Sequence, residues 1–275
     1  MQGTGGPQAN YSGVGHTLNV LAGVYGMTAY EDGEVVGPGT NFPDHSVNPG
    51  HALVAILAAL AYRRRTGRGQ YIEVSQLEST LNLLGPSILA YSLNRENPAP
   101  QGNTLPTAAP YGVFPCADDA WIAISVSDDA QWEGICKIAN GANWNADARF
   151  DTQEKRNAEA ATLHAIVAEW TKDQDPDALM ETLQANGVPA GKVQTAKDLV
   201  DDDPQMAARG HFVTLDHAEM GPTVYNNAPY RLTKTPGRPQ HAAPLLGEHN
   251  KHVFQGMLGL SDEEMTRLQE ADVFK

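Results

Sequence analysis

The first residue of this chain that could carry chemistry is an aspartate in a loop-forming segment, Asp44. It lies in NFPDHSVNPGH (41–51), a stretch rich in Pro, Gly and Asn that leads into a long apolar helix pattern. The positive end of the helix dipole favours an ionised carboxylate there, and such a carboxylate can act as a nucleophile or proton acceptor. Spacing alone favours an ordinary turn or capping aspartate, so both interpretations stay open.

Three histidines lie near Asp44 in the sequence. His16 belongs to the glycine-flanked segment GVGHTLN (13–19), and His45 and His51 flank the aspartate. The unperturbed pKa of histidine suits acid–base catalysis, although spacing alone favours a surface or capping role for His16. The pattern D-H-x5-H in a loop matches no standard metal site, so we expect no bound metal.

The run RRRTGRGQ (63–70) is the one dense basic segment of an acidic chain. Lys and Arg together number 19 against 33 Asp and Glu, which gives a formal net charge of −14. Such a chain is a poor candidate for binding nucleic acid or an anionic membrane. The simpler interpretation is that the arginines complement the C-terminal end of a helix dipole. In the alternative, Arg65 and Arg68 attract a polyanion such as a nucleotide phosphate.

No part of the sequence predicts export or a membrane span. The N-terminus has no signal-peptide pattern, and the most apolar run, 52–61, is much shorter than the roughly 20 residues that cross a bilayer. Cys116 and Cys136 lack a metal-type spacing, so we expect reduced structural thiols. We therefore expect a cytoplasmic protein.

The element that must position Asp44 is the long helix that follows it. The sequence HALVAILAALAYRRR (51–65) is apolar on nearly every face, which predicts a helix buried in the middle of the molecule. Ser46 or Asn48 can cap its start. Gly67 or Gly69 can adopt the left-handed conformation that ends a helix.

The remaining pattern predicts few strands at first, then a mixed α/β block, then helices. A Pro-rich segment, 95–110, is expected to be a linker between domains. After it, YGVFPC (111–116) and WIAISV (121–126) predict a hairpin. The other expected elements are, in chain order, a helix at 17–27, a strand at 71–76, a helix at 77–94, helices at 129–139, 154–171 and 176–186, a strand at 190–194, a helical turn at 196–201, strands at 211–217 and 222–228, and two C-terminal helices, the last with the capping box Ser261 and Glu264.

The order of these elements argues against a self-contained doubly wound sheet. Such a sheet needs strands that alternate with helices from the start, and the opening of this chain lacks them. We therefore expect another polypeptide segment or another chain to supply a sheet.

The motif around Asp44 resembles the class III coenzyme A transferase family, also called the carnitine dehydratase and bile-acid-inducible protein F family. The similarity comprises the loop aspartate, the long Ala/Leu helix and TGRGQYIEVSQLE (66–78). The segments GHTLN and NFPDH look most like members that handle benzylsuccinate-type or other dicarboxylic acids. Further matching segments follow in the same order: 101–116, 121–132, 187–193, 202–210 and 243–250.

The resemblance implies an α/β fold with a partial Rossmann-like large domain, a smaller α/β domain and an intertwined dimer. Residues 1–94 would belong to the large domain and carry Asp44, residues 111–215 would form the small domain, and 216–275 would return to the large domain. Family members carry an additional N-terminal portion that supplies much of the sheet and many coenzyme A contacts. We expect that portion to come from the rest of a longer chain or from a partner.

The resemblance also implies the chemistry of Asp44. As a transferase, Asp44 would form an aspartyl anhydride and then an aspartyl-coenzyme A thioester, with the thioester substrate as the only cofactor-like molecule. In the racemases of this family, the histidine of a GH-x-x-N motif and the loop aspartate exchange an α-proton, which His16 and Asp44 would also fit. Asp129 lies near the position of a supporting glutamate in the racemases, although the shorter side chain argues against that role. A third alternative is a non-catalytic subunit of a heteromeric transferase.

Overall fold

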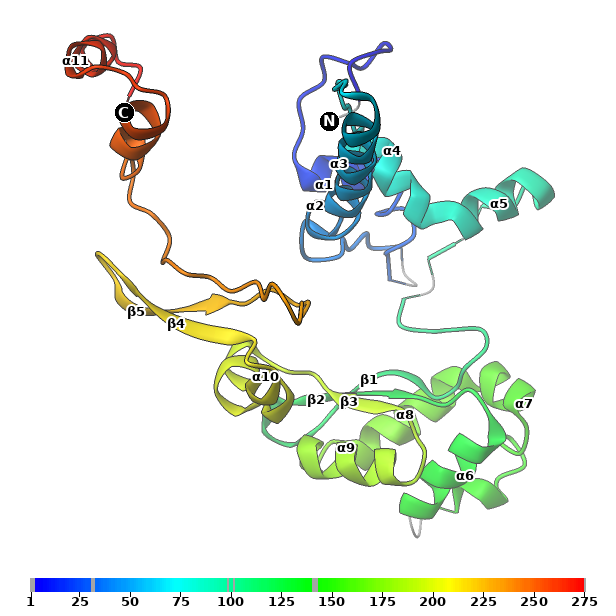
Figure 1. Ribbon diagram of the computed structural model, residues 1–275. Coiled ribbons are helices and arrows are strands. Elements are labelled where there is room, and N and C mark those ends of the chain that lie inside the picture. Colours follow the sequence, from blue (N-terminus) through cyan, green and yellow to red (C-terminus); the bar gives the residue numbers. More distant parts are fainter. Residues whose placement is uncertain (1–2, 31–32, 98, 101, 140–142, 275) are drawn as a thin grey trace. The chain divides into compact units, whose positions relative to one another are not determined.

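The computed structural model of the chain describes residues 3–30, 33–97, 99–100, 102–139 and 143–274 (Figure 1). The chain has a mixed α/β fold and divides into two compact units, residues 1–193 and 194–275. The domain limits predicted at residues 94, 110 and 215 stay predictions.

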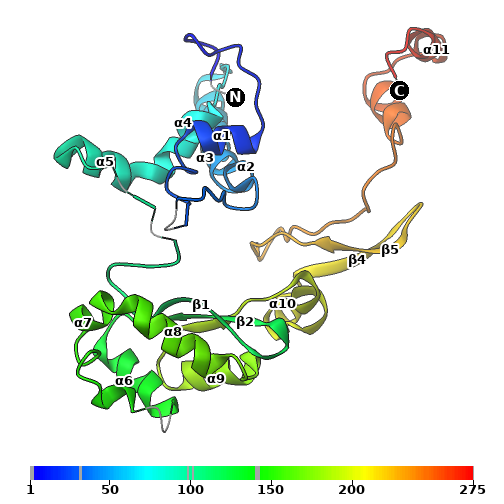
Figure 2. The same ribbon diagram turned by 180° about the vertical axis from the view of Figure 1, so that it is seen from behind.

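The first part of unit 1 is helical. Its elements are α1 (Gly15–Leu21), α2 (Phe42–His45), α3 (Val47–Thr66), α4 (Gln76–Leu81), a 3₁₀ turn η1 (Asn82–Leu84) and α5 (Gly85–Asn94). Helices α1 to α4 contact one another, as both views show, and α5 extends from this group (Figures 1 and 2). We call residues 15–94 the helical segment.

Helix α3 is not buried in the way its composition predicts. Of its residues, only Asn48 is buried, and the side chains of Leu53, Val54 and Leu57 are 56%, 68% and 56% exposed. Apolar residues on every face of a helix need neighbours on every face, and α2 and α4 are its principal neighbours here. The prediction of a buried helix is therefore wrong for this chain by itself.

Other details of the helical segment also differ from prediction. The expected strand at 71–76 is absent from this described stretch, because residues 67–75 are irregular and α4 begins at Gln76. The first helix, expected at 17–27, is α1 and ends at Leu21. The C-terminal end of α3 is as predicted, because Gly67 adopts a left-handed conformation with φ of 71°.

The second part of unit 1 has an apolar core built around a small sheet. Strands β1 (Tyr111–Pro115), β2 (Trp121–Ser125) and β3 (Ala190–Lys192) pair antiparallel in the order β1-β2-β3, which confirms the predicted hairpin. We call residues 108–193 the α/β segment. Its helical elements are η2 (Ala117–Asp119), α6 (Asp129–Ile138), η3 (Trp144–Ala146), α7 (Gln153–Ala158), α8 (Ala160–Thr171) and α9 (Pro176–Ala185).

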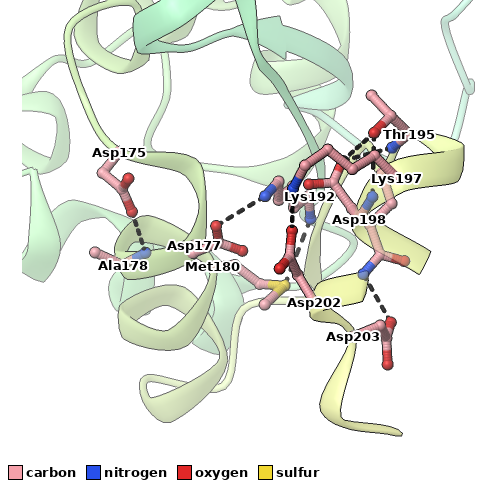
Figure 3. Close-up of polar contacts among 11 residues, drawn as sticks. Asp175, Asp177, Ala178, Met180, Lys192, Thr195, Lys197, Asp198, Asp202 and Asp203 are labelled. Carbon is pink, nitrogen blue, oxygen red and sulfur yellow. Dashed lines mark hydrogen bonds and ion pairs between the residues drawn. The ribbon is translucent and has the colours of Figure 1, made fainter. Parts of the chain in front are cut away.

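The predicted helices of the α/β segment form with small changes. The helix expected at 154–171 is two helices, α7 and α8, that meet at Glu159. Asp175 caps α9 by accepting a hydrogen bond of 2.8 Å from the backbone N–H of Ala178 (Figure 3). The Lys192 ammonium donates to the Asp177 carboxylate at 2.8 Å, which links β3 to α9 (Figure 3).

Unit 2 consists of a hairpin and terminal helical turns. Its elements are a π-helical turn η4 (Asp198–Asp202), α10 (Pro204–Arg209), strands β4 (Phe212–His217) and β5 (Gly221–Asn226), a π-helical turn η5 (Lys251–Met257) and α11 (Asp262–Glu270). The pairing of β4 with β5 and the capping box of Ser261 with Glu264 are as predicted. At the start of η4, Asp198 accepts hydrogen bonds from the backbone and hydroxyl of Thr195 (Figure 3). Within the described ranges, no helix is long and apolar enough to cross a membrane.

Candidate active site

Asp44 lies where α1, α2, α3 and α4 come together. It is in the one-turn helix α2 and is half-buried. Its Oδ1 accepts two hydrogen bonds of 3.2 Å, one from the side-chain amide of Asn48 and one from that of Gln76. The carboxylate is thus held by neutral donors, and it forms no ion pair among the described residues.

The other carboxylate oxygen of Asp44 lies against Gly15, the first residue of α1. A Cβ atom at position 15 would lie 2.2 Å from Oδ2 of Asp44 and 2.7 Å from Cγ of Asn41. Cβ atoms do not tolerate contacts under 3.0 Å, so the aspartate can occupy this position only because residue 15 has no side chain. The glycine before His16 therefore has a steric role at the site.

The amide donors stand on regular structure rather than on flexible loops. Asn48 is buried in the first turn of α3. Gln76 opens α4, whose N-cap Ser75 accepts a hydrogen bond of 3.3 Å from the backbone N–H of Glu78. Asn48 does not cap α3, contrary to one sequence-based alternative, because its amide points to Asp44. Ser46 precedes α3, but its hydroxyl donates to the carbonyl of Phe42 instead.

Several asparagine side chains of the helical segment have buried polar atoms. Asn19 is completely buried, and both polar atoms of its side chain lack a partner in the described part of the chain. The same holds for the buried Oδ1 atoms of Asn41 and Asn48. Buried amides without partners are costly in a folded domain, so these atoms mark a place built for polar contacts.

His16 lies beside the aspartate in the chain fold but contacts a different residue. It follows Gly15 directly, is exposed, and its Nδ1 shares a hydrogen bond of 3.0 Å with the hydroxyl of Tyr25. A Cβ atom at Gly37 would lie 2.2 Å from Cζ of Tyr25, so that glycine makes room for the tyrosine ring. The contact orients the imidazole and leaves Nε2 available to a ligand.

The two other histidines do not converge on Asp44. Nδ1 of His51 lies 3.0 Å from the carbonyl of Val47, and its Nε2 lies 3.3 Å from the Asn82 amide. His45 is exposed on α2. In the ranges that the structure describes, no group of three or more His, Cys, Asp or Glu side chains has the arrangement of a metal site.

Arg65 and Arg68 lie at the opposite end of α3 from Asp44. Both are exposed, and neither side chain forms an ion pair within the described residues. Eighteen residues separate Arg65 from the start of α3, which is about 27 Å along a helix. A single ligand that touched both Asp44 and these arginines would have to be about as long as the helix.

Asp129 is engaged elsewhere. Nη2 of Arg156 donates to its carboxylate at 2.6 Å, and Arg156 itself is completely buried. The guanidinium also donates to the carbonyl of Phe150 and lies 5.1 Å from the centre of the Trp132 ring. These contacts give Asp129 a structural role in the α/β segment.

Neither cysteine has the environment of a nucleophile. Burial raises the pKa of the Cys136 thiol to about 11, and burial, followed by the nearby Asp175 carboxylate, raises that of Cys116. Both thiols are free.

Sequence reasoning missed the residues that hold Asp44. Asn48 carries a usable signal, since it lies four residues after Asp44 and such pairs meet on a helical surface. Gln76 is 32 residues away, and Tyr25 and Gly37 belong to segments with no chemical motif. Their roles become visible only when the helices are packed.

Comparison with known proteins places this geometry in a family. A sequence model of CoA-transferase family III matches residues 1–250. The chain is 30% identical to succinyl-CoA–D-citramalate CoA-transferase of Chloroflexus aurantiacus, over 97% of this chain and 66% of the relative. It is 34% identical to succinyl-CoA:mesaconate CoA-transferase of Haloarcula marismortui, over 85% of this chain and 58% of the relative.

A solved structure agrees with these sequence matches. The crystal structure of a CAIB/BAIF family protein from Brucella suis superimposes with a TM-score of 0.81 at 28% identity, over 91% of this chain and 64% of that one. The chain thus spans about two thirds or less of the length of these relatives. The family match covers the Asp44 motif, the first unit and residues 194–250 of the second unit, and the chain belongs to CoA-transferase family III.

Proposed function

We propose that this chain carries the nucleophile of a coenzyme A transferase, and that the nucleophile is Asp44. The observation that supports the proposal best is the position of the Asp44 carboxylate. Its Oδ1 accepts hydrogen bonds from two side-chain amides, and its Oδ2 packs against Gly15. A carboxylate held by neutral amides rather than by an ion pair can attack a thioester carbonyl as a nucleophile.

The reaction proceeds through two covalent intermediates. Asp44 attacks the acyl carbon of the donor thioester and expels coenzyme A as its thiolate, which leaves a mixed anhydride. The thiolate attacks the aspartyl carbon and releases the donor acid, which leaves an aspartyl-coenzyme A thioester. The acceptor carboxylate attacks this thioester, and the thiolate then takes the acceptor's acyl group, so Asp44 is regenerated with one oxygen from the acceptor.

The substrates we propose are a coenzyme A thioester and a small dicarboxylic acid. The relatives named above use succinyl-CoA with citramalate or mesaconate, according to their names. Another relative, from Agrobacterium fabrum, is named succinate–glutarate CoA-transferase and is 29% identical over 92% of this chain. Arg65 and Arg68 remain proposed contacts for the phosphates of coenzyme A. The cytoplasmic location predicted from the sequence is compatible with such a substrate.

A racemase that uses His16 and Asp44 is a second candidate function. It is favoured by the imidazole, whose Nδ1 contacts Tyr25 while Nε2 is available for proton transfer. A racemase exchanges the α-proton of its thioester with solvent, whereas a transferase need not.

We propose that this chain works in an assembly with further polypeptide of the same family. The exposed apolar residues of α3 and α5 are more than a soluble monomer tolerates. Relatives from Chloroflexus aurantiacus are named alpha and beta subunits of succinyl-CoA–L-malate CoA-transferase. A homodimer or a complex with a second chain of this family would each cover this surface, and a non-catalytic role in such a complex is the third alternative.

Mass spectrometry of the purified assembly separates these functions. Incubation with succinyl-CoA should attach coenzyme A to the Asp44 peptide, and turnover with ¹⁸O-labelled succinate should place the label in the Asp44 carboxylate. Asp44→Asn should lose both signals and more than about 99% of transfer activity, because an amide cannot form the anhydride. Release of deuterated thioester in D₂O without an adduct would establish racemisation. In that case His16→Ala should lose roughly 10²–10⁴-fold in rate.

A further inference from the structure

The two hydrogen bonds to Asp44 converge on one oxygen. Asn48 and Gln76 both donate to Oδ1, each at 3.2 Å, while Oδ2 lies against Gly15 and accepts no hydrogen bond from the residues that the structure describes. The amide orientations follow from chemistry, since an ionised carboxylate only accepts hydrogen bonds and each N–H must therefore face it. The carboxylate thus has one oxygen with two donors and one oxygen that packs against Gly15 and has none among these residues.

This asymmetry matters at the covalent intermediates of the proposed function, on which the inference rests. When the thiolate adds to the aspartyl carbon of the anhydride, the electron pair of its C=O bond moves onto the carbonyl oxygen. The C–O bond to the donor acyl group then breaks, and the donor acid leaves with the former nucleophilic oxygen. If Oδ2 attacks, Oδ1 is the carbonyl oxygen that becomes an oxyanion in every addition to this carbon.

We propose that the side-chain amides of Asn48 and Gln76 form the oxyanion hole for Asp44. They donate to the atom on which charge develops, and donors in that position usually supply the largest single contribution to acyl transfer. Here the glycine at position 15 clears space for the carboxylate, and the amides carry the donor role.

The geometry suits donors that tighten as charge grows. A distance of 3.2 Å is at the long end of the hydrogen-bond range. In the thioester state Oδ1 is a neutral carbonyl oxygen, and in the tetrahedral state it carries a full charge, so the bonds strengthen most when they are needed. Asn48 is buried in α3 and Gln76 opens α4, so neither donor must be ordered during the reaction.

The test replaces each amide side chain by one of similar shape that has no N–H group. Gln76→Met and Asn48→Leu delete the N–H groups at nearly constant volume, and each should lower kcat by roughly 10²–10³-fold with little change in KM. The matched control is Gln184→Met, because Gln184 also donates one amide hydrogen bond, to the carbonyl of Ala190 at 2.8 Å in the α/β segment. That variant should keep its activity within about twofold, a surface change of small effect.

A single-turnover measurement gives the readout that a structural role would not move. With succinyl-CoA in excess, the rate at which coenzyme A appears on Asp44 should fall with kcat in both variants, while thermal unfolding of Gln76→Met stays close to that of Gln184→Met. Gln76 is only half-buried, so its variant tests the proposal even if Asn48→Leu fails to fold.

The outcomes separate the inference from the function on which it rests. If the unmodified protein forms no adduct on Asp44, the transferase proposal fails, and the oxyanion hole fails with it. If the adduct forms in the unmodified protein and forms at the same rate in Gln76→Met, the transferase stands and the oxyanion hole is overturned. An equal loss in Gln184→Met would also overturn it, because the effect would then be one of general stability.

Discussion

The helical segment and the α/β segment differ in how much apolar surface they bury. The α/β segment has a continuous apolar core, with side chains such as Ile122, Leu163 and Leu183 completely buried. The helical segment has its long apolar helix α3 largely exposed, whereas Asn19, Asn48, Ser75, Ser79 and Thr80 are among its buried residues. The α/β segment is stabilised by its own apolar core, and the helical segment is built around the Asp44 carboxylate.

This difference shows where each segment obtains its stability. A core of large aliphatic and aromatic side chains is sufficient for a small domain. Buried polar residues contribute little unless their hydrogen bonds are complete, so the helical segment needs additional apolar burial from elsewhere. Its exposed leucines and valines are the surface on which we expect that burial to occur.

The prediction with the largest expected effect concerns oligomeric assembly, which would cover the exposed helical segment. We expect the purified protein to sediment as an oligomer at micromolar concentration, because the exposed apolar residues of α3 and α5 must be covered. Sedimentation velocity over a range of concentrations measures this directly. A stable, well-folded species of 29.5 kDa at all concentrations would mean that the helices cover one another in solution.

Two leucine substitutions, one in each segment, test this difference in burial. Leu183→Ala empties a site that is completely buried in the α/β segment, and should lower the free energy of unfolding by about 2–5 kcal/mol. Leu57→Ala truncates a side chain that is 56% exposed on α3, and within a single chain should change that free energy by no more than about 0.5 kcal/mol.

Protein concentration distinguishes the two leucines further. If α3 is covered by a partner, the loss caused by Leu57→Ala should depend on protein concentration, and the loss caused by Leu183→Ala should not. Thermal unfolding at several concentrations provides the measurement. A concentration-independent loss of several kcal/mol in Leu57→Ala would show that α3 is buried within its own chain.

The sequence predicts the α/β segment better than the helical one for a physical reason. In β1 and β2, alternation and the turn at Ala117–Asp119 are local signals, and the partner strand is next in the chain. The strand expected at 71–76 failed because alternation predicts a strand only where another strand can pair with it. Among the described residues, this stretch lies between helices α3 and α4 in the sequence and pairs with no strand.

The candidate site, too, could be predicted only where the signals in the sequence are local. Asp44 and His16 are identifiable because each lies in a segment with unusual Gly and Pro content. Gln76 is invisible to local reasoning, since nothing in QLEST indicates that an amide will meet a carboxylate 32 residues earlier. Packing of α2 against α4 creates that contact, so the role of Gln76 follows only from the fold.

A further test of the helical segment concerns the close contact between Gly15 and Asp44. Gly15→Ala would place a Cβ atom 2.2 Å from Oδ2 of Asp44, so the carboxylate must move away from its position. A displacement of about 1 Å at a reacting group can cost about 100-fold in rate, and we expect a loss of that size in transfer activity. The control is Gly50→Ala on α3, where a Cβ atom would meet no atom within 4 Å and where alanine favours the helix. Steady-state kinetics of both variants decide the matter, because equal activities would mean that Asp44 does not need its position against α1, and the helical segment would then lose its interpretation as a segment built around this carboxylate.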